Sequence, residues 1–137
     1  MYKSTPRRGF ARFGVALLTL CAGTALAHHS FAMYDNEHQV KWVGTVANFQ
    51  WTNPHVYIEL DVPQEGKASK HYTIECANPG ILSRIGWKFN MIKPGDKLTV
   101  IVAPLRTGEP GALLKKVTLP DGRAFNNGGP AGPALID

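Results

Sequence analysis

The chain has 137 residues, with 15 lysines and arginines against 10 aspartates and glutamates, and a formal net charge of +5. Four of the basic residues lie within residues 1–27, namely Lys3, Arg7, Arg8 and Arg12. The remaining chain is therefore close to neutral, which argues against a nucleic-acid-binding protein. About 110 residues remain after residue 27, enough for one domain with one modest core.

Residues 1–27 have the organisation of a secretory signal peptide. A basic start is followed by an apolar run from Phe13 to Leu26, and Ala25-Leu26-Ala27 is a small-x-small cleavage site. The apolar run is shorter than the roughly 20 residues that span a bilayer. We therefore expect a periplasmic or secreted protein, cut after Ala27, with no membrane span after processing. The Arg7-Arg8 pair leaves both the general secretory and the twin-arginine route open.

Residues 28–38 lack periodicity and are expected to form an irregular N-terminal arm. Residues 39–51 are rich in valine, tryptophan, phenylalanine and threonine, which predicts a long strand with a bend or bulge at Gly44. After a turn at Thr52-Asn53-Pro54, apolar and polar residues alternate over residues 56–62. The same alternation recurs over residues 70–76, so both segments are expected to be strands with one buried face.

A short helix is predicted after the third strand. Asn78 suits the N-cap position, Pro79 the first helical position and Gly86 the end of the helix. Its apolar stripe consists of Ile81, Leu82 and Ile85.

Two further strands are expected over residues 98–102 and 112–119. The Gly/Pro-rich segment 126–137 is expected to be a disordered tail. The order β-β-β-α-β-β over residues 39–125 predicts a mainly β domain, a small five-stranded OB-like barrel with one short helix between strands three and four. A β-sandwich with an inserted helical turn is the alternative.

Several short motifs resemble those of the DUF6152 family of small exported bacterial proteins of unknown function. They are His28-His29-Ser30-Phe31-Ala-Met-Tyr-Asp35, Trp51-Thr-Asn-Pro-His-Val56, Glu75-x-x-x-Pro79-x-x-Leu82-x-Arg84-x-Gly86-Trp87 and Pro94-Gly-Asp96. The resemblance implies a periplasmic protein with a small β-rich domain, and it implies no established activity.

Cleavage after Ala27 would give a chain that starts with two histidines. The amine and ring of His28 can chelate one metal ion, and His29 can add its ring and backbone nitrogen. His55 is the candidate for a further nitrogen ligand in a planar copper site, with His38 and His71 as other possibilities. Alternatively, the two N-terminal histidines are ordinary polar residues at a frayed terminus.

Tyr57, His71 and Glu75 are predicted to form a ligand face. Their parity places them on the outer side of strands two and three, a region that OB-folds use for binding. The alternative is an ordinary solvated sheet face. Glu75 has no nucleophile spaced to partner it, and Cys76 has the parity of a buried thiol, so no catalytic residue is predicted.

These observations favour an exported, non-catalytic binding module. Its ligand is expected to be a small molecule, a metal ion or an envelope protein. The first alternative is a copper-binding protein that uses His28, His29 and His55. A copper-dependent oxidase that reuses the same N-terminus is a weaker alternative.

Overall fold

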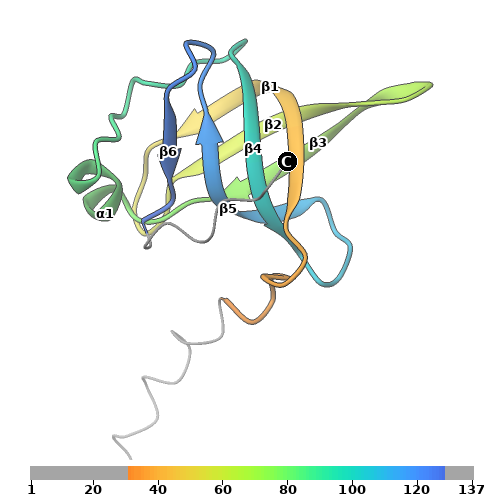
Figure 1. Ribbon diagram of the computed structural model, residues 1–137, viewed down its shortest axis with the longest axis horizontal. Helices are drawn as coiled ribbons and strands as arrows, with labels where there is room; N and C mark the ends of the chain where they lie inside the picture. Colours follow the sequence, from red (N-terminus) through yellow and green to blue (C-terminus); the bar gives the residue numbers. More distant parts are fainter. Residues whose placement is uncertain (1–30, 129–137) are drawn as a thin grey trace, which may run out of the picture. The chain divides into compact units, whose positions relative to one another are not determined.

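The computed structural model describes residues 31–128. The predicted signal peptide, His28, His29 and residues 129–137 of the predicted tail lie outside the described residues. Within residues 31–128 the elements are β1 (Val40–Gln50), β2 (Tyr57–Gln64), β3 (Lys67–Glu75), α1 (Pro79–Arg84), β4 (Lys97–Pro104), β5 (Gly111–Thr118) and β6 (Ala124–Asn126) (Figure 1).

The strands form one sheet that closes on itself. Neighbouring strands pair in the order β3-β2-β1-β4-β5-β6, and β3 also pairs in parallel with β5, where Thr73 lies opposite Gly111. This last pairing joins the first five strands into a closed barrel, while β6 adds to β5 outside the closure. The predicted mainly β, OB-like five-stranded barrel with its helix between β3 and β4 is confirmed, and β6 is an addition.

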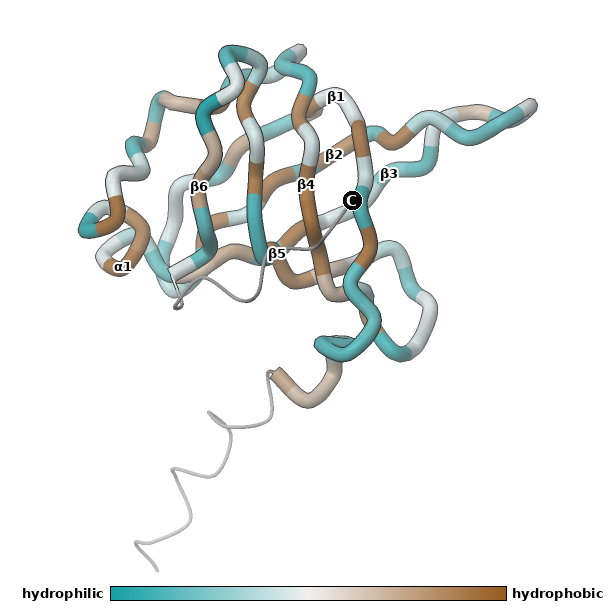
Figure 2. Tube along the Cα trace, viewed as in Figure 1, coloured by the Kyte–Doolittle hydropathy of each residue, from teal (hydrophilic) through white to brown (hydrophobic). Residues whose placement is uncertain are grey.

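Strand alternation determines which side chains fill the barrel. Along β2 the side chains of Ile58 and Leu60 are fully buried, whereas Tyr57 and Glu59 are only half-buried on the outer face. In Figure 2 the hydrophobic residues are concentrated on the barrel strands and the end of the β2–β3 hairpin is mostly hydrophilic. The inward residues make one continuous core, whose largest fully buried side chains are Ile58, Leu60, Ile74, Leu82, Leu98 and Leu114.

The irregularity of β1 differs from the prediction. The register of β1 against β2 shifts between Val46 and Asn48, so the bulge does not fall at Gly44. Gly44 instead allows β1 and β2 to approach closely, since a Cβ there would lie 2.7 Å from the carbonyl oxygen of Asp61. A glycine within a strand often marks such a backbone approach.

The helix forms as its caps predict. The Asn78 side chain accepts a hydrogen bond from the backbone N–H of Ile81 at 2.9 Å, Pro79 opens the helix, and Gly86 follows it with φ of +95°. Of the predicted apolar stripe only Leu82 is buried, whereas Ile81 and Ile85 stay exposed. Because the helix has only six residues, Leu82 is the one helical side chain that it buries.

Both ends of the described chain are attached to the barrel. In the irregular arm, Tyr34 is 5% exposed and packs with Ala103 and Leu113. At the other end, Asn126 ends β6, and the Asn127 side chain accepts from the backbone N–H of Ala77. The ordered domain therefore continues past residue 125, and the predicted disordered tail does not begin at residue 126.

Candidate ligand-binding site

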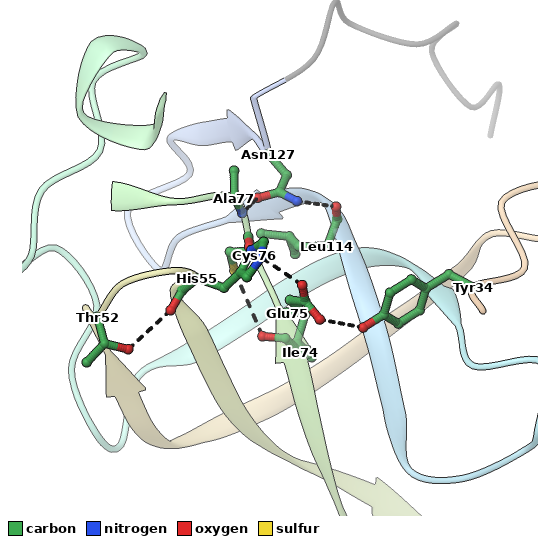
Figure 3. A network of polar contacts seen from close by, with 9 residues as sticks. All are labelled: Tyr34, Thr52, His55, Ile74, Glu75, Cys76, Ala77, Leu114 and Asn127. Atoms are coloured by element: carbon green, nitrogen blue, oxygen red, sulfur yellow. Dashed lines mark hydrogen bonds and ion pairs between the residues drawn. The ribbon is translucent and has the colours of Figure 1, made fainter. Parts of the chain in front are cut away.

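Glu75, the last residue of β3, is the centre of a polar cluster at one end of the outer face (Figure 3). One carboxylate oxygen, Oε2, accepts a hydrogen bond from the Tyr34 hydroxyl at 2.7 Å. The other oxygen, Oε1, lies 3.3 Å from Nδ1 of His55. The side chains of Glu75 and His55 are 18% and 32% exposed, so the cluster is half-buried and open to solvent on one side.

Strand pairing brings these residues together. Tyr57 lies opposite Glu75 in the β2–β3 ladder. Beyond the ladder, backbone hydrogen bonds join Val56 to Cys76 and Ala77, which holds the end of the β1–β2 connection against β3. Within that connection the Thr52 hydroxyl donates to the carbonyl oxygen of His55 at 3.1 Å.

The surroundings of His55 define which ring nitrogen carries the proton. Nδ1 lies 3.0 Å from the carbonyl oxygen of Cys76, and a carbonyl can only accept, so we assign an N–H to Nδ1. Within residues 31–128 the other nitrogen, Nε2, has no hydrogen-bond partner. In the neutral ring Nε2 therefore keeps its lone pair for an incoming donor or a metal ion.

The two tyrosines beside Glu75 are held in their protonated form. Burial, followed by the hydrogen bond to Glu75 and its negative charge, raises the pKa of Tyr34 far above its usual value. Burial and the charge of Glu75 also raise the pKa of Tyr57. Both phenols are therefore neutral hydroxyl groups next to a carboxylate.

A second cluster lies further along the same face. His71 Nδ1 lies 2.7 Å from Asp61 Oδ1, and His71 Nε2 lies 2.9 Å from Glu59 Oε2. The Thr73 hydroxyl donates to the same Glu59 oxygen at 2.8 Å. The hydrogen bond to Asp61, supported by Glu59, raises the pKa of His71, which favours an imidazolium between two carboxylates.

The structure thus divides the predicted ligand face in two. Tyr57 and Glu75 are direct neighbours, whereas His71 lies opposite Asp61, separated from them along the strands by the Glu59–Thr73 pair. Both ring nitrogens of His71 are engaged by carboxylates, which does not favour it as a metal ligand. His38 pairs with Asp35 in the arm, at 2.9 Å, and belongs to neither cluster.

The structure also bears on two other predictions, the metal site and the buried thiol of Cys76. In the part of the chain that the structure covers, 31–128, no group of three or more His, Cys, Asp or Glu residues could hold a metal ion. Any copper site at His55 thus depends on ligands such as His28 and His29, which lie outside the described residues. Cys76 is buried as expected, and burial raises the pKa of its thiol well above the ordinary value.

Sequence reasoning did not single out Tyr34 as a site residue. It lies in a segment without periodicity, 41 residues before the glutamate that it contacts. The local signal is a tyrosine that follows Phe31-Ala32-Met33 and precedes the polar Asp35 in an irregular arm, and a buried tyrosine usually finds a partner for its hydroxyl.

The fold and the cluster define a small OB-like β-barrel protein with a polar site beside the β1–β2 connection. The chain belongs to DUF6152, a family of unknown function, whose model matches residues 16–114. No curated protein and no solved structure matches the chain significantly. Among the helices in the described residues, none has the length and apolar character needed to cross a membrane.

Proposed function

We propose that this protein is an exported, non-catalytic binding module with its ligand site at Glu75, His55 and Tyr57. The observation that carries the proposal is the half-buried Glu75 carboxylate, held by Tyr34 and facing His55. OB-folds bind ligands on the face of strands two and three and through the adjoining loop between strands one and two. Export is supported by the basic, apolar and small-residue pattern of residues 1–27.

The chemistry of this face favours a cationic or donor-rich ligand. Glu75 supplies carboxylate oxygens and His55 supplies the lone pair of Nε2. Glu59 and Asp61 add negative charge further along β2, and within residues 31–128 His71 is the basic side chain that pairs with both of them. Such a surface attracts cations and repels phosphate backbones.

The proposal is tested by titrating the exported protein with cationic probes, such as spermidine and divalent metal ions, while backbone amide shifts are recorded by NMR. We expect shifts centred on His55, Tyr57 and Glu75. E75Q should abolish them, while E65Q, a matched change at an exposed glutamate of the β2–β3 turn, should not. Shifts that survive E75Q would move the site elsewhere, and turnover of a ligand that E75Q abolishes would contradict the non-catalytic assignment.

Copper binding through the N-terminal His28, with His29 and His55, is the second candidate function. One specific observation favours it: His55 donates from Nδ1 to a backbone carbonyl, with a carboxylate at 3.3 Å. Histidines that bind metals almost always use their other N–H in this way. Neutral imidazole and amine nitrogens are ligands that suit copper. A copper-dependent oxidase would use the same ligands, and no separate observation supports it.

Copper binding is tested by electron paramagnetic resonance of the processed protein during titration with Cu(II). We expect a nitrogen-rich copper signal that H55A weakens and that one extra residue before His28 abolishes. H38A is the matched control, because His38 is exposed and pairs only with Asp35 among the described residues. Equal binding with and without the extra residue would rule out a site that uses the terminal amine.

A further inference from the structure

Exposed apolar side chains are concentrated on α1 and the loop that follows it. Six large apolar side chains are exposed within residues 31–128, and three of them lie in a stretch of nine residues. These three are Ile81, Ile85 and Phe89, which are 37%, 44% and 70% exposed. Single exposed apolar residues are common on protein surfaces, whereas a group of them marks a surface for a partner or a membrane.

Other side chains anchor this segment to the barrel. Its residues in the core are Leu82, Trp87 and Ile92. The backbone N–H of Trp87 donates to the carbonyl oxygen of Leu82 at 3.0 Å, and that of Met91 donates to Lys88 at 3.2 Å, which closes a turn containing Phe89. The core is thus filled without the three exposed side chains, which are left for another contact.

The same segment carries only positive charge. No aspartate or glutamate occurs between Glu75 and Asp96, whereas Arg84, Lys88 and Lys93 are all exposed. Within residues 31–128 none of these three basic side chains forms an ion pair. Because the chain after residue 27 is close to neutral as a whole, this is a local concentration of positive charge. Exposed apolar side chains beside lysine and arginine are the combination that binds anionic bilayer surfaces.

We propose that residues 79–93, here called the α1 surface, bind the face of an anionic phospholipid bilayer. The side chains of Ile81, Ile85 and Phe89 enter the boundary between headgroups and acyl chains, and the nearby lysines and arginine reach the lipid phosphates. In Figure 1, α1 and the loop after it lie at the periphery of the barrel, where a bilayer can approach them. The α1 surface is independent of the ligand site at Glu75.

Charge complementarity selects a bilayer over a second copy of the chain. A symmetric dimer through the α1 surface would bring the same positive charges together, and like charges across an interface repel. Anionic lipids attract each lysine or arginine near the surface, which raises the affinity about fivefold per residue. Burial of a phenylalanine ring adds about tenfold or more.

Sedimentation with phospholipid vesicles tests the α1 surface in the protein recovered after export. One set of vesicles contains phosphatidylcholine and phosphatidylglycerol in equal parts, and the other contains phosphatidylcholine alone. We expect clearly tighter binding to the anionic vesicles. The affinity should fall when salt is added, because salt screens exposed charges.

Matched variants locate the binding surface. F89S should weaken binding at least about tenfold, whereas F31S should not, although Phe31 is also exposed, at 61%. K88Q and K93Q should each weaken binding about fivefold. Their control is K67Q, a change at an exposed lysine at the start of β3, which should bind as the parent protein does. Thermal unfolding of each variant verifies that it is folded.

Several results would overturn the proposal. These are no binding to the anionic vesicles, equal binding to both kinds of vesicle, and an equal loss in F89S and F31S. A dimer that F89S dissociates, in a protein that binds no vesicles, would show that a second copy is the partner. Binding that appears only after removal of residues 129–137 would show that this segment covers the α1 surface instead.

Discussion

Gly44 of β1 lies directly against Leu60 of β2: a Cβ at position 44 would be 2.8 Å from Cγ of the leucine. Leu60 is fully buried and cannot move away without disturbing the core. We therefore expect G44A to lower the free energy of unfolding by about 1–3 kcal/mol, the usual cost of overpacking. Urea denaturation measures this loss.

The control for G44A is T45A, a change at the next residue of β1, whose side chain is exposed. Exposed substitutions away from special features usually change stability by less than about 0.5 kcal/mol. Similar stability of G44A and the parent protein would show that β1 and β2 can separate at this point without loss.

Asn127 joins the segment after β3 to β5. Its side-chain oxygen accepts from the Ala77 N–H at 2.7 Å, and its side-chain nitrogen donates to the Leu114 carbonyl at 2.8 Å. N127A should lower the free energy of unfolding by about 1–3 kcal/mol, because it leaves partly buried backbone groups without partners.

Asn126 provides a matched control for N127A. Within residues 31–128 its side chain makes no hydrogen bond, and the Trp87 indole N–H donates to its backbone carbonyl at 3.1 Å, so N126A keeps that hydrogen bond. Thermal unfolding should show a clearly lower melting temperature for N127A than for N126A. Equal stability would mean that Asn127 does not attach the chain to the barrel in solution.

His71 should make stability depend on pH. Its pKa is raised in the folded state by Asp61 and Glu59 above the ordinary value of about 6.5. A raised folded pKa gives stability that is fully present below the unfolded pKa and is lost as pH rises through the folded pKa. The advantage of the parent protein over H71Q should therefore shrink as the pH is raised from 6 to 9.

The measurement for His71 is the free energy of unfolding of both proteins across that pH range. Proton NMR of the His71 ring gives its pKa, which should fall when Asp61 and Glu59 are replaced in D61N/E59Q. A constant difference between the parent protein and H71Q at all pH values would contradict the charged pairing.

Cys76 should be unreactive in the folded protein. Burial raises the pKa of its thiol, and the side chain is 1% exposed, so neither thiolate nor access is available. In a C21S background, a thiol reagent should label Cys76 only after denaturant is added. Rapid labelling of the native protein would show that this part of the barrel opens readily.

Local patterns predicted most of the fold. The alternation over residues 56–62 gave the buried face of β2, because side chains of a strand point to opposite sides in turn. The caps of α1 were predictable from Asn78 and Pro79, since these residues act through hydrogen bonds and φ angles within a few positions. The short strand β6 was missed because three residues carry no periodicity.

The site was predictable only in part. Parity placed Tyr57 and Glu75 on one outer face, and the turn placed His55 near the end of β1. Parity also grouped His71 with them, but His71 lies four positions before Glu75 on β3. Because each residue along a strand adds about 3.3 Å, the two side chains share a face without being neighbours. The role of Tyr34 could not be predicted from the sequence, because no local rule relates a residue of an irregular arm to the end of a strand.

The sequence by itself determined the strand faces, the helix caps, the buried thiol and the order of elements up to β5, because these depend on periodicity and on contacts within a few residues. Only the tertiary structure decided that Tyr34 reaches Glu75, that Glu75 faces His55 and that Asn127 secures the chain after β3. These contacts join residues 20 to 50 positions apart, and they exist because β3 pairs with both β2 and β5 to close the barrel.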